Sequence, residues 1–210
     1  WQLMMVNFQK VSFLSSAPKL SLCPPDEGIE IAFAGRSNAG KSTALNTLVK
    51  NKKLAKTSKT PGRTQLINFF ELNENQRLVD LPGYGYAKVP LSVKRKWDIN
   101  LSEYLRFRQS LRGLILLMDS RHPLTEYDRQ ILMWSSQTNL EVHILLTKAD
   151  KQKNNALKTT LEKVKNFTLD PELSLPSISV QLFSSKSKLG LKEFEEKINS
   201  WFTRELLNPQ

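Results

Sequence analysis

The sequence predicts an α/β fold with three layers, in which helices cover both faces of a mostly parallel sheet of six strands, one of them antiparallel. Two observations lead to this prediction. Short apolar runs alternate with amphipathic segments along almost the whole 210 residues, which is the pattern of successive strand–helix units. One pair of apolar runs is instead joined by a tight turn at residues 73–75, which predicts a hairpin and hence the antiparallel strand.

The elements are expected in the following order. Residues 1–25 form an irregular N-terminal segment, because Pro18, Pro24 and Pro25 interrupt it. A single domain covers residues 26–206 and a short tail covers 207–210, since no repeat or shift in composition marks a second domain. Strands are predicted at residues 29–34, 65–72, 77–80, 113–119, 141–147 and 177–184, and helices at 41–50, 91–110, 124–138, 154–168 and 191–206.

Periodicity distinguishes the two kinds of element. Residues 113–119 are continuously apolar, as in a parallel strand that is buried on both faces. Residues 91–110 instead place Val93, Trp97, Leu101 and Leu105 at helical spacing. Residues 51–64 are polar and basic, and a loop of this length is usually functional or disordered.

The composition is strongly basic. Lysine and arginine number 31 against 20 aspartates and glutamates, so the net charge is +11. Such a domain attracts polyanions, with an ordinary basic surface as the alternative. No apolar run approaches the roughly 18 residues of a membrane helix, and we expect no membrane partner. The single cysteine, Cys23, and the lack of signal-peptide features in residues 1–25 favour a cytoplasmic protein.

Residues 35–42, GRSNAGKS, fit the phosphate-loop pattern G-x-x-x-x-G-K-[S/T] between a predicted strand and a predicted helix. The glycines let several N–H groups point at one phosphate, and the helix N-terminus adds a favourable dipole. Lys41 is expected to reach the β- and γ-phosphates and Ser42 to ligate Mg²⁺. The alternative is a glycine-rich turn without a ligand. The expected nucleotide contacts are Gly35, Arg36, Ser37, Asn38, Ala39, Gly40, Lys41 and Ser42.

Two further segments predict that the base is guanine. The stretch Thr147, Lys148, Ala149 and Asp150 follows a buried strand and matches [N/T]-K-x-D. The Asp150 carboxylate can accept two hydrogen bonds from guanine, whereas adenine would leave it unpaired. Thr147 departs from the usual asparagine, which puts one base or loop contact in doubt; Asp150 as a plain helix cap is the alternative. After the last strand, Phe183, Ser184 and Ser185 are expected to face the guanine O6.

Two loops between these motifs are candidate switches. Asp80, Leu81, Pro82 and Gly83 fit D-x-x-G: Asp80 is expected to act at Mg²⁺ and the Gly83 N–H at the γ-phosphate. Tyr84 stands where other GTPases place a water-orienting glutamine, so intrinsic hydrolysis should be slow. Thr64 is the candidate second Mg²⁺ ligand, with Thr60 as the alternative. Nucleotide contacts are also expected from Gly62, Arg63, Thr64, Gln65 and Leu66.

With GRSNAGKS, TSKTPGRTQ, DLPGYGYA and TKAD in this order, the chain resembles the EngB family of bacterial GTPases, also called YihA or YsxC. The resemblance spans about residues 17–203. It implies a single Ras-like G domain that hydrolyses GTP to GDP with Mg²⁺, a role in assembling the large ribosomal subunit, and a link to normal cell division and septation. The catalytic residues would then be Lys41, Thr64, Gly83 and Asn38, and the protein is expected to be a monomer.

Relatives in the wider class use an asparagine of the phosphate loop to ligate a potassium ion. Asn38 stands at that position; the alternative is that it only braces the loop. Positive charge also gathers beside both candidate switches and suits ribosomal RNA, or is only a solvated surface. These basic residues are Lys52, Lys53, Lys56, Lys59, Arg63, Lys88, Lys94, Arg95 and Lys96.

Two other functions stay open from the sequence. A nucleotide-dependent phosphotransferase would share the phosphate loop but needs an inserted lid, and none is evident after the central strands. An RNA-binding module with a vestigial nucleotide site would not need Lys41, Ser42, Asp80 and Asp150 to be intact, and all four are.

Overall fold

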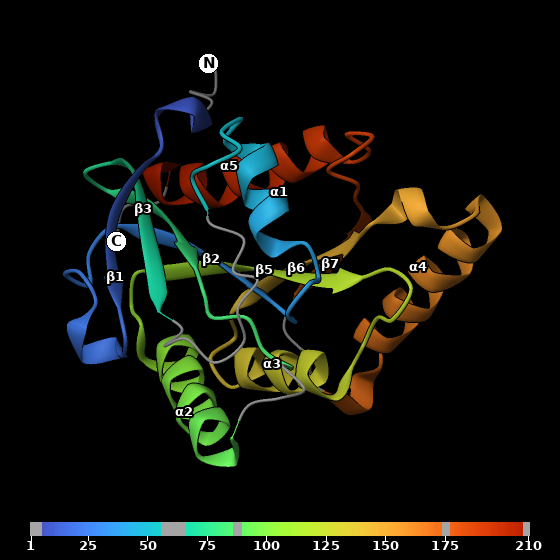
Figure 1. The fold of residues 1–210 in the computed structure, drawn as a ribbon, viewed down its shortest axis with the longest axis horizontal. Coiled ribbons are helices and arrows are strands. Elements are labelled where there is room, and N and C mark those ends of the chain that lie inside the picture. Colours follow the sequence, from blue (N-terminus) through green and yellow to red (C-terminus); the bar gives the residue numbers. More distant parts are fainter. Residues whose placement is uncertain (1–5, 56–65, 86–89, 174–176, 208–210) are drawn as a thin grey trace.

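The computed structural model describes residues 6–55, 66–85, 90–173 and 177–207. One sheet lies between two layers of helices (Figure 1). Helices α1 (Lys41–Leu48) and α5 (Leu191–Leu207) cover one face, while α2 (Leu91–Phe107), α3 (Glu126–Ser136) and α4 (Asn154–Thr168) cover the other. Each layer has its own apolar core, centred on Phe194 and Trp201 on the first face and on Tyr104 and Ile131 on the second. The three-layer α/β prediction is therefore confirmed.

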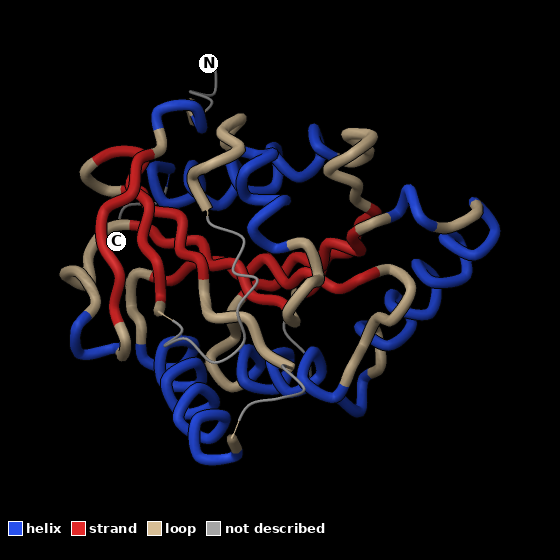
Figure 2. The backbone as a smooth tube through the Cα atoms, viewed as in Figure 1, coloured by secondary structure: helices blue, strands red, loops and turns tan. Residues whose placement is uncertain are grey.

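The sheet has seven strands, drawn in red in Figure 2, in the order β1-β3-β4-β2-β5-β6-β7. The strands are β1 (Ser12–Ala17), β2 (Ile29–Gly35), β3 (Ile67–Asn73), β4 (Gln76–Asp80), β5 (Leu111–Asp119), β6 (Glu141–Thr147) and β7 (Ile178–Leu182). Strands β4, β2, β5, β6 and β7 run parallel, and β3 pairs antiparallel with both β4 and β1. The predicted hairpin is β3–β4, and it supplies the predicted antiparallel strand.

The predicted strand count of six was wrong, because β1 lies in the segment that was expected to be irregular. The sequence of β1, SFLSSA, is half serine, and in this edge position Ala17 is its only buried residue. It pairs with β3 from Ser12 opposite Glu71 to Ala17 opposite Ile67, with a bulge between Phe13 and Ser15. A half-solvated edge strand of this kind has no apolar run to reveal it. The three prolines lie beyond its end.

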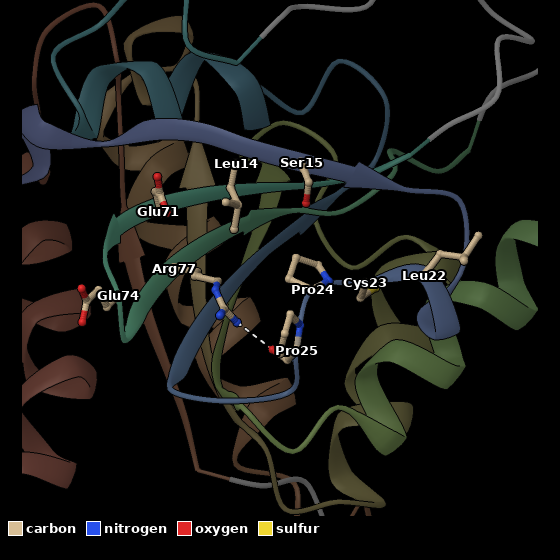
Figure 3. A pocket seen from close by; sticks show the side chains of 9 residues that line it. All are labelled: Leu14, Ser15, Leu22, Cys23, Pro24, Pro25, Glu71, Glu74 and Arg77. Atoms are coloured by element: carbon tan, nitrogen blue, oxygen red, sulfur yellow. Dashed lines mark hydrogen bonds between the residues drawn. The ribbon is translucent and has the colours of Figure 1, made fainter.

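A buried carboxylate holds the N-terminal segment to the sheet. Glu30 of β2 is fully buried, and its two oxygens accept hydrogen bonds from Arg77, Arg108 and Tyr104 at 2.6–3.1 Å. Arg77 also donates to the Pro25 carbonyl at 3.0 Å, a bond drawn in Figure 3. Helix α2 ends at Phe107, before the predicted residue 110, because Arg108 turns to extended backbone (φ −72°, ψ 109°) where it meets Glu30.

The residues that precede helices α3 and α1 determine where these two helices begin. Helix α3 begins at Glu126, after Thr125, because Thr125 and Asp128 exchange hydrogen bonds in a capping box. Helix α1 begins directly after Gly40, whose φ of 89° only glycine adopts readily. No helix in the described ranges is long and apolar enough to cross a bilayer.

Candidate nucleotide-binding site

The loop between β2 and α1 has the shape of an anion cradle. Its first residue, Gly35, packs so closely on β5 that an added Cβ would lie 3.0 Å from the Leu117 carbonyl oxygen. The Ala39 N–H turns back to the Arg36 carbonyl at 2.9 Å, and Asn38 and Gly40 both have positive φ, 65° and 89°. Left-handed residues within such a turn direct successive N–H groups toward one point. The N-terminus of α1 faces the same place.

A charged pair lies at the helix end of this cradle. The Lys41 ammonium is ion-paired with the Asp80 carboxylate at the end of β4, and both side chains are about nine-tenths buried. The D-x-x-G loop that follows Asp80 is tied to the phosphate loop: the Ser37 N–H donates to the Tyr84 carbonyl at 2.7 Å. The two motifs, which are about forty residues apart in the sequence, therefore form one hydrogen-bonded unit.

The oxygen donors near this pair suit magnesium. Asp80 supplies a carboxylate and the half-buried Ser42 supplies a hydroxyl in the first turn of α1. Mg²⁺ prefers such hard oxygen ligands and keeps several waters and phosphate oxygens in its shell. The donor set therefore fits the ion. Thr64, the other predicted ligand, lies outside the described residues.

The predicted base-recognition segments meet beyond the other end of the loop. The Ser184 hydroxyl, which is fully buried, donates to Asp150 Oδ1 at 2.7 Å, and the Ala149 N–H donates to the Phe183 carbonyl at 3.2 Å. The bond from Ser184 is the main cause that holds the pKa of Asp150 below its ordinary value of 3.8. Asp150 is thus an oriented, ionised carboxylate at neutral pH, and its second oxygen lies 3.9 Å from the Lys151 ammonium.

Thr147 has a role that the sequence did not reveal. It is buried, with 3% of its surface exposed, and its hydroxyl lies 2.6 Å from the Ala39 carbonyl oxygen of the phosphate loop. The next residue, Lys148, adds a second tie, because its ammonium donates to the Asn38 carbonyl at 2.6 Å. Lys148 also contacts Asp119 at 3.1 Å. The departure from asparagine therefore preserves a direct bond between the base-binding and phosphate-binding segments.

Tyr84 faces away from the phosphate loop. Only 4% of the residue is exposed, its hydroxyl donates to Asp128 of α3 at 2.7 Å, and its ring stacks on Tyr127 at 5.3 Å. Burial, together with the negative charge of Asp128, raises the pKa of Tyr84 well above 10. A phenol held in this way does not orient a water at a phosphate. The pairing of Tyr84 with Asp128 spans 44 residues, and only the buried aspartate of a capping box could have suggested it.

Other predicted residues fall into two groups. Leu66, Leu81, Pro82, Gly83 and Ser185 are described, and Leu66 directly precedes β3. The basic residues Lys52, Lys53, Lys94, Arg95 and Lys96 are exposed, the last three in the first two turns of α2. The residues Gly62, Arg63, Gln65, Lys56, Lys59, Thr60 and Lys88 lie outside the described residues.

Comparison with known proteins identifies the family of the chain. Residues 30–148 match the family model described as "50S ribosome-binding GTPase". The "Probable GTP-binding protein EngB" of Idiomarina loihiensis is 54% identical over 200 residues, which cover 95% of this chain and 96% of the relative. That of Psychromonas ingrahamii is 54% identical over 207 residues, covering 95% and 92%.

Solved structures agree on the fold. The "Crystal structure of a probable GTP-binding protein engB" superposes with a TM-score of 0.66 at 21% identity, and the match covers 83% of this chain and 99% of that one. Era in complex with MgGDPNP and part of 16S ribosomal RNA gives a TM-score of 0.60 at 18% identity, covering 83% and 57%. At these identities the likeness concerns the fold alone.

The fold, with its strand–loop–helix cradle and the segments gathered around it, defines a P-loop GTPase. The family match and the two close relatives make the assignment narrower: the chain belongs to the EngB family of GTP-binding proteins.

The ion pair of the cradle yields a prediction. Lys41 is predicted to contact the phosphates, so its replacement with alanine should remove a bond to a charged group, which is typically worth about 1.5–3 kcal/mol. We therefore expect GTP affinity to fall by roughly 10- to 150-fold, measured with a fluorescent GTP analogue. Ser42→Ala should instead weaken the dependence of binding on Mg²⁺. The exposed Lys158→Ala on α4 is the control. Unchanged affinity and hydrolysis in both site variants would contradict the assignment of this loop.

Proposed function

We propose that this protein is a GTP-driven switch in the assembly of the large ribosomal subunit and that it hydrolyses GTP slowly until a partner completes its site. One observation carries the proposal: four loops that follow the carboxyl ends of parallel strands meet in one place. They are the phosphate loop, the D-x-x-G loop, the T-K-x-D segment and the Ser184 loop. The family model, which describes a 50S ribosome-binding GTPase, supports the choice of partner. We also propose a monomer that works in the cytoplasm.

In this proposal each segment contacts one part of the nucleotide. Asp150 accepts from the guanine N1–H and exocyclic amine, and the loop of Phe183, Ser184 and Ser185 faces O6. Residues 35–42 hold the phosphates, and Lys41 exchanges its bond to Asp80 for the β- and γ-phosphates. The Gly83 N–H and residues 62–66 respond to the γ-phosphate.

Magnesium would be held by Ser42 and Asp80, with Thr64 joining in the GTP state. The ion supplies positive charge that offsets the charge developing on the phosphate oxygens during transfer. Asp80 becomes available for this role when Lys41 turns to the phosphates. The same carboxylate therefore binds Lys41 in the structure and would hold the ion when nucleotide is bound. Asp80 and Ser42 would hold the ion beside the phosphates, while Lys41 would contact those phosphates directly.

The slow rate follows from Tyr84, because the tyrosine hydroxyl is bound to Asp128 and no side chain at this position orients the attacking water. Even Ras, which has the glutamine, turns over at about 10⁻⁴ per second without its activator. We therefore expect very slow turnover in single-turnover assays of the purified protein.

A monovalent cation beside Asn38 would supply part of the missing charge. The Asn38 main-chain carbonyl is taken by Lys148, whereas its exposed side chain lies at the rim of the cradle. We expect replacement of sodium by potassium to raise the hydrolysis rate of the wild type but not that of Asn38→Ala. The rate of phosphate release in the two salts measures this. Equal rates in both salts for the wild type would mean that Asn38 only braces the loop.

The basic start of α2 is the proposed contact with ribosomal RNA. Lys94, Arg95 and Lys96 are exposed and follow the D-x-x-G loop, so they are well placed to report the nucleotide state. Each phosphate contact releases counterions and contributes about 0.7–0.9 to the slope of log affinity against log salt. Changing all three to alanine should therefore make this negative slope shallower by roughly 2–3 and leave GTP affinity unchanged.

The matched control carries the same loss of charge elsewhere. Lys158, Lys163 and Lys165 are exposed on α4, and their triple alanine variant should bind large-subunit particles with the wild-type salt dependence. If the α2 variant also matches the wild type across the salt series, the start of α2 is not the docking surface.

The biological role is tested by depletion. Cells depleted of the protein should accumulate precursors of the large subunit in sucrose gradients, while small-subunit precursors stay at their ordinary level. Filamentous cells in the same culture would agree with the family link to division and septation. Normal large-subunit maturation after depletion would overturn the proposal.

A further inference from the structure

The edge strand β1 leaves one side of the sheet open. Among the described residues no segment pairs with its outer side. Within Ser12–Ala17 there is no lysine, arginine or proline, the residues that usually protect an edge from pairing; the bulge at Leu14 is its one such device. Large apolar side chains also face solvent here, with Phe13 56%, Leu14 38% and Leu22 59% exposed. The outer edge of β1 therefore offers main-chain groups that pair with no other described strand, together with exposed apolar side chains.

A groove of about 360 Å³ lies on the sheet face beside this edge, between β1, β3 and β4 on one side and residues 22–25 on the other. Figure 3 shows its lining: Leu14 and Ser15 on β1, Glu71 and Glu74 on and beside β3, and Leu22 with the following prolines on the opposite wall. The Ser15 hydroxyl is shielded from water and has no hydrogen-bond partner among the described residues. A buried hydroxyl without a partner is uncommon in folded proteins. The groove therefore combines an apolar wall, an acidic end and an unused polar group.

The charge of this groove is opposite to that of the whole chain. Arg77 lines it, but its guanidinium is paired with the buried Glu30 at 3.1 Å. Glu71 and Glu74 have no ion pair in the described part of the chain; Glu71 only accepts a weak bond from Ser12 at 3.4 Å. Two uncompensated carboxylates on a protein of net charge +11 make a local acidic spot.

We propose that the open edge of β1, together with the groove beside it, is a docking site for an extended basic segment of a partner protein, which adds to the sheet as an eighth strand. Its main chain would pair with β1, its apolar side chains would cover Leu14 and Leu22, and its lysines or arginines would reach Glu71 and Glu74. Strand addition of this kind takes its affinity from main-chain bonds and its selectivity from alternate side chains.

Charge complementarity selects this occupant over a second copy of the chain. Two copies joined edge to edge through β1 would leave Glu71 and Glu74 of each copy without a basic partner, because the β1 sequence SFLSSA carries no lysine or arginine. The site also lies away from the nucleotide. The groove borders residues that precede β2, whereas the phosphate loop follows the other end of β2. The proposal therefore goes beyond the proposed GTP switch and does not depend on it.

The test uses a fluorescent capped peptide, Lys-Val-Arg-Val-Lys-Val, and the full chain bound to GDP. We expect saturable binding by fluorescence polarisation, with amide NMR shifts concentrated on residues 12–17. The same peptide with alternate backbone nitrogens methylated should not bind, because it cannot complete the strand ladder. Glu71→Lys/Glu74→Lys should weaken binding by about tenfold. Its control, Glu162→Lys/Glu193→Lys, has the same net charge on exposed helix positions and should bind as the wild type does.

Several results would overturn the proposal. They are the absence of binding, equal binding of the methylated peptide, NMR shifts away from β1, an equal loss in both charge variants, or a concentration-dependent dimer that peptide does not dissociate. If the double variant does not fold, Glu74→Lys in the exposed turn before β4 gives the same reading. Since no ribosomal particle or GTP hydrolysis enters this assay, its failure and that of the proposed GTP switch are distinguishable.

Discussion

Asp150→Asn is expected to change the preferred nucleotide from GTP to XTP. The carboxylate accepts two hydrogen bonds, which matches the two donors of guanine. An amide accepts one and donates one, which matches xanthine, where an oxygen replaces the exocyclic amine. A site built around such bonds can reject the wrong partner by about 10⁴–10⁵-fold, so the ratio of GTP to XTP affinity should fall by up to roughly 10⁴-fold. Competition of both nucleotides against a fluorescent GTP analogue measures the ratio.

The bond between Ser184 and Asp150 supplies a second variant for the same experiment. Because the Ser184 hydroxyl orients the carboxylate, Ser184→Ala should weaken GTP binding without creating affinity for XTP. Asp170→Asn, in the exposed turn after α4, is a matched control and should keep the wild-type preference. If Asp150→Asn keeps full GTP preference, Asp150 does not read the base and the guanine assignment rests on the wrong residue.

Glu30→Gln is expected to destabilise the fold strongly. The carboxylate is fully buried between the guanidinium groups of Arg77 and Arg108. Burial lowers the pKa of Arg108, but the hydrogen bond and the charge of Glu30 outweigh burial and raise it above its ordinary value. A guanidinium is not deprotonated in proteins, so both arginines keep their charge when Glu30 becomes a neutral amide. Removing one partner from a buried ion pair typically costs 3–5 kcal/mol, and we expect a loss of about that size in the free energy of unfolding by urea.

An exposed glutamate gives the matched control. Glu74→Gln removes the same charge from a solvated turn and should change the free energy of unfolding by less than about 0.5 kcal/mol. The nucleotide site lies at the opposite end of β2, so GTP affinity should survive in Glu30→Gln wherever the variant remains folded. A Glu30→Gln variant as stable as the wild type would mean that the cluster does not anchor the N-terminal segment.

Local sequence patterns predicted most of the fold. The strands β5 and β6 were found because their long apolar runs are typical of strands that are buried on both faces of a parallel sheet. Helix α2 was found from its i, i+4 stripe. Strand β1 was missed because this edge strand buries only Ala17 and its serines interrupt any apolar run or alternation. Glu30 sat inside an otherwise apolar strand, and only its long-range partners show why a charge is tolerated there.

The candidate site likewise has a part that the sequence predicts and a part that only the structure shows. The phosphate loop, Asp80 and Asp150 were predicted because each belongs to a short contiguous motif whose spacing the backbone dictates. The contact of Thr147 with Ala39 joins residues 108 apart, and that of Tyr84 with Asp128 joins residues 44 apart. Contacts between distant segments depend on strand order, which a single sequence does not specify. The roles of Gly62, Arg63, Thr64 and Gln65 stay predictions, since these residues lie outside the described part of the chain.

Co-sedimentation of the purified protein with large ribosomal subunits tests the central claim most directly. The wild type is loaded with a non-hydrolysable GTP analogue or with GDP and spun with the particles at a fixed salt concentration. The proposed switch predicts tight binding with the GTP analogue and clearly weaker binding with GDP. Equal binding in the two nucleotide states, or no binding in either, would contradict it.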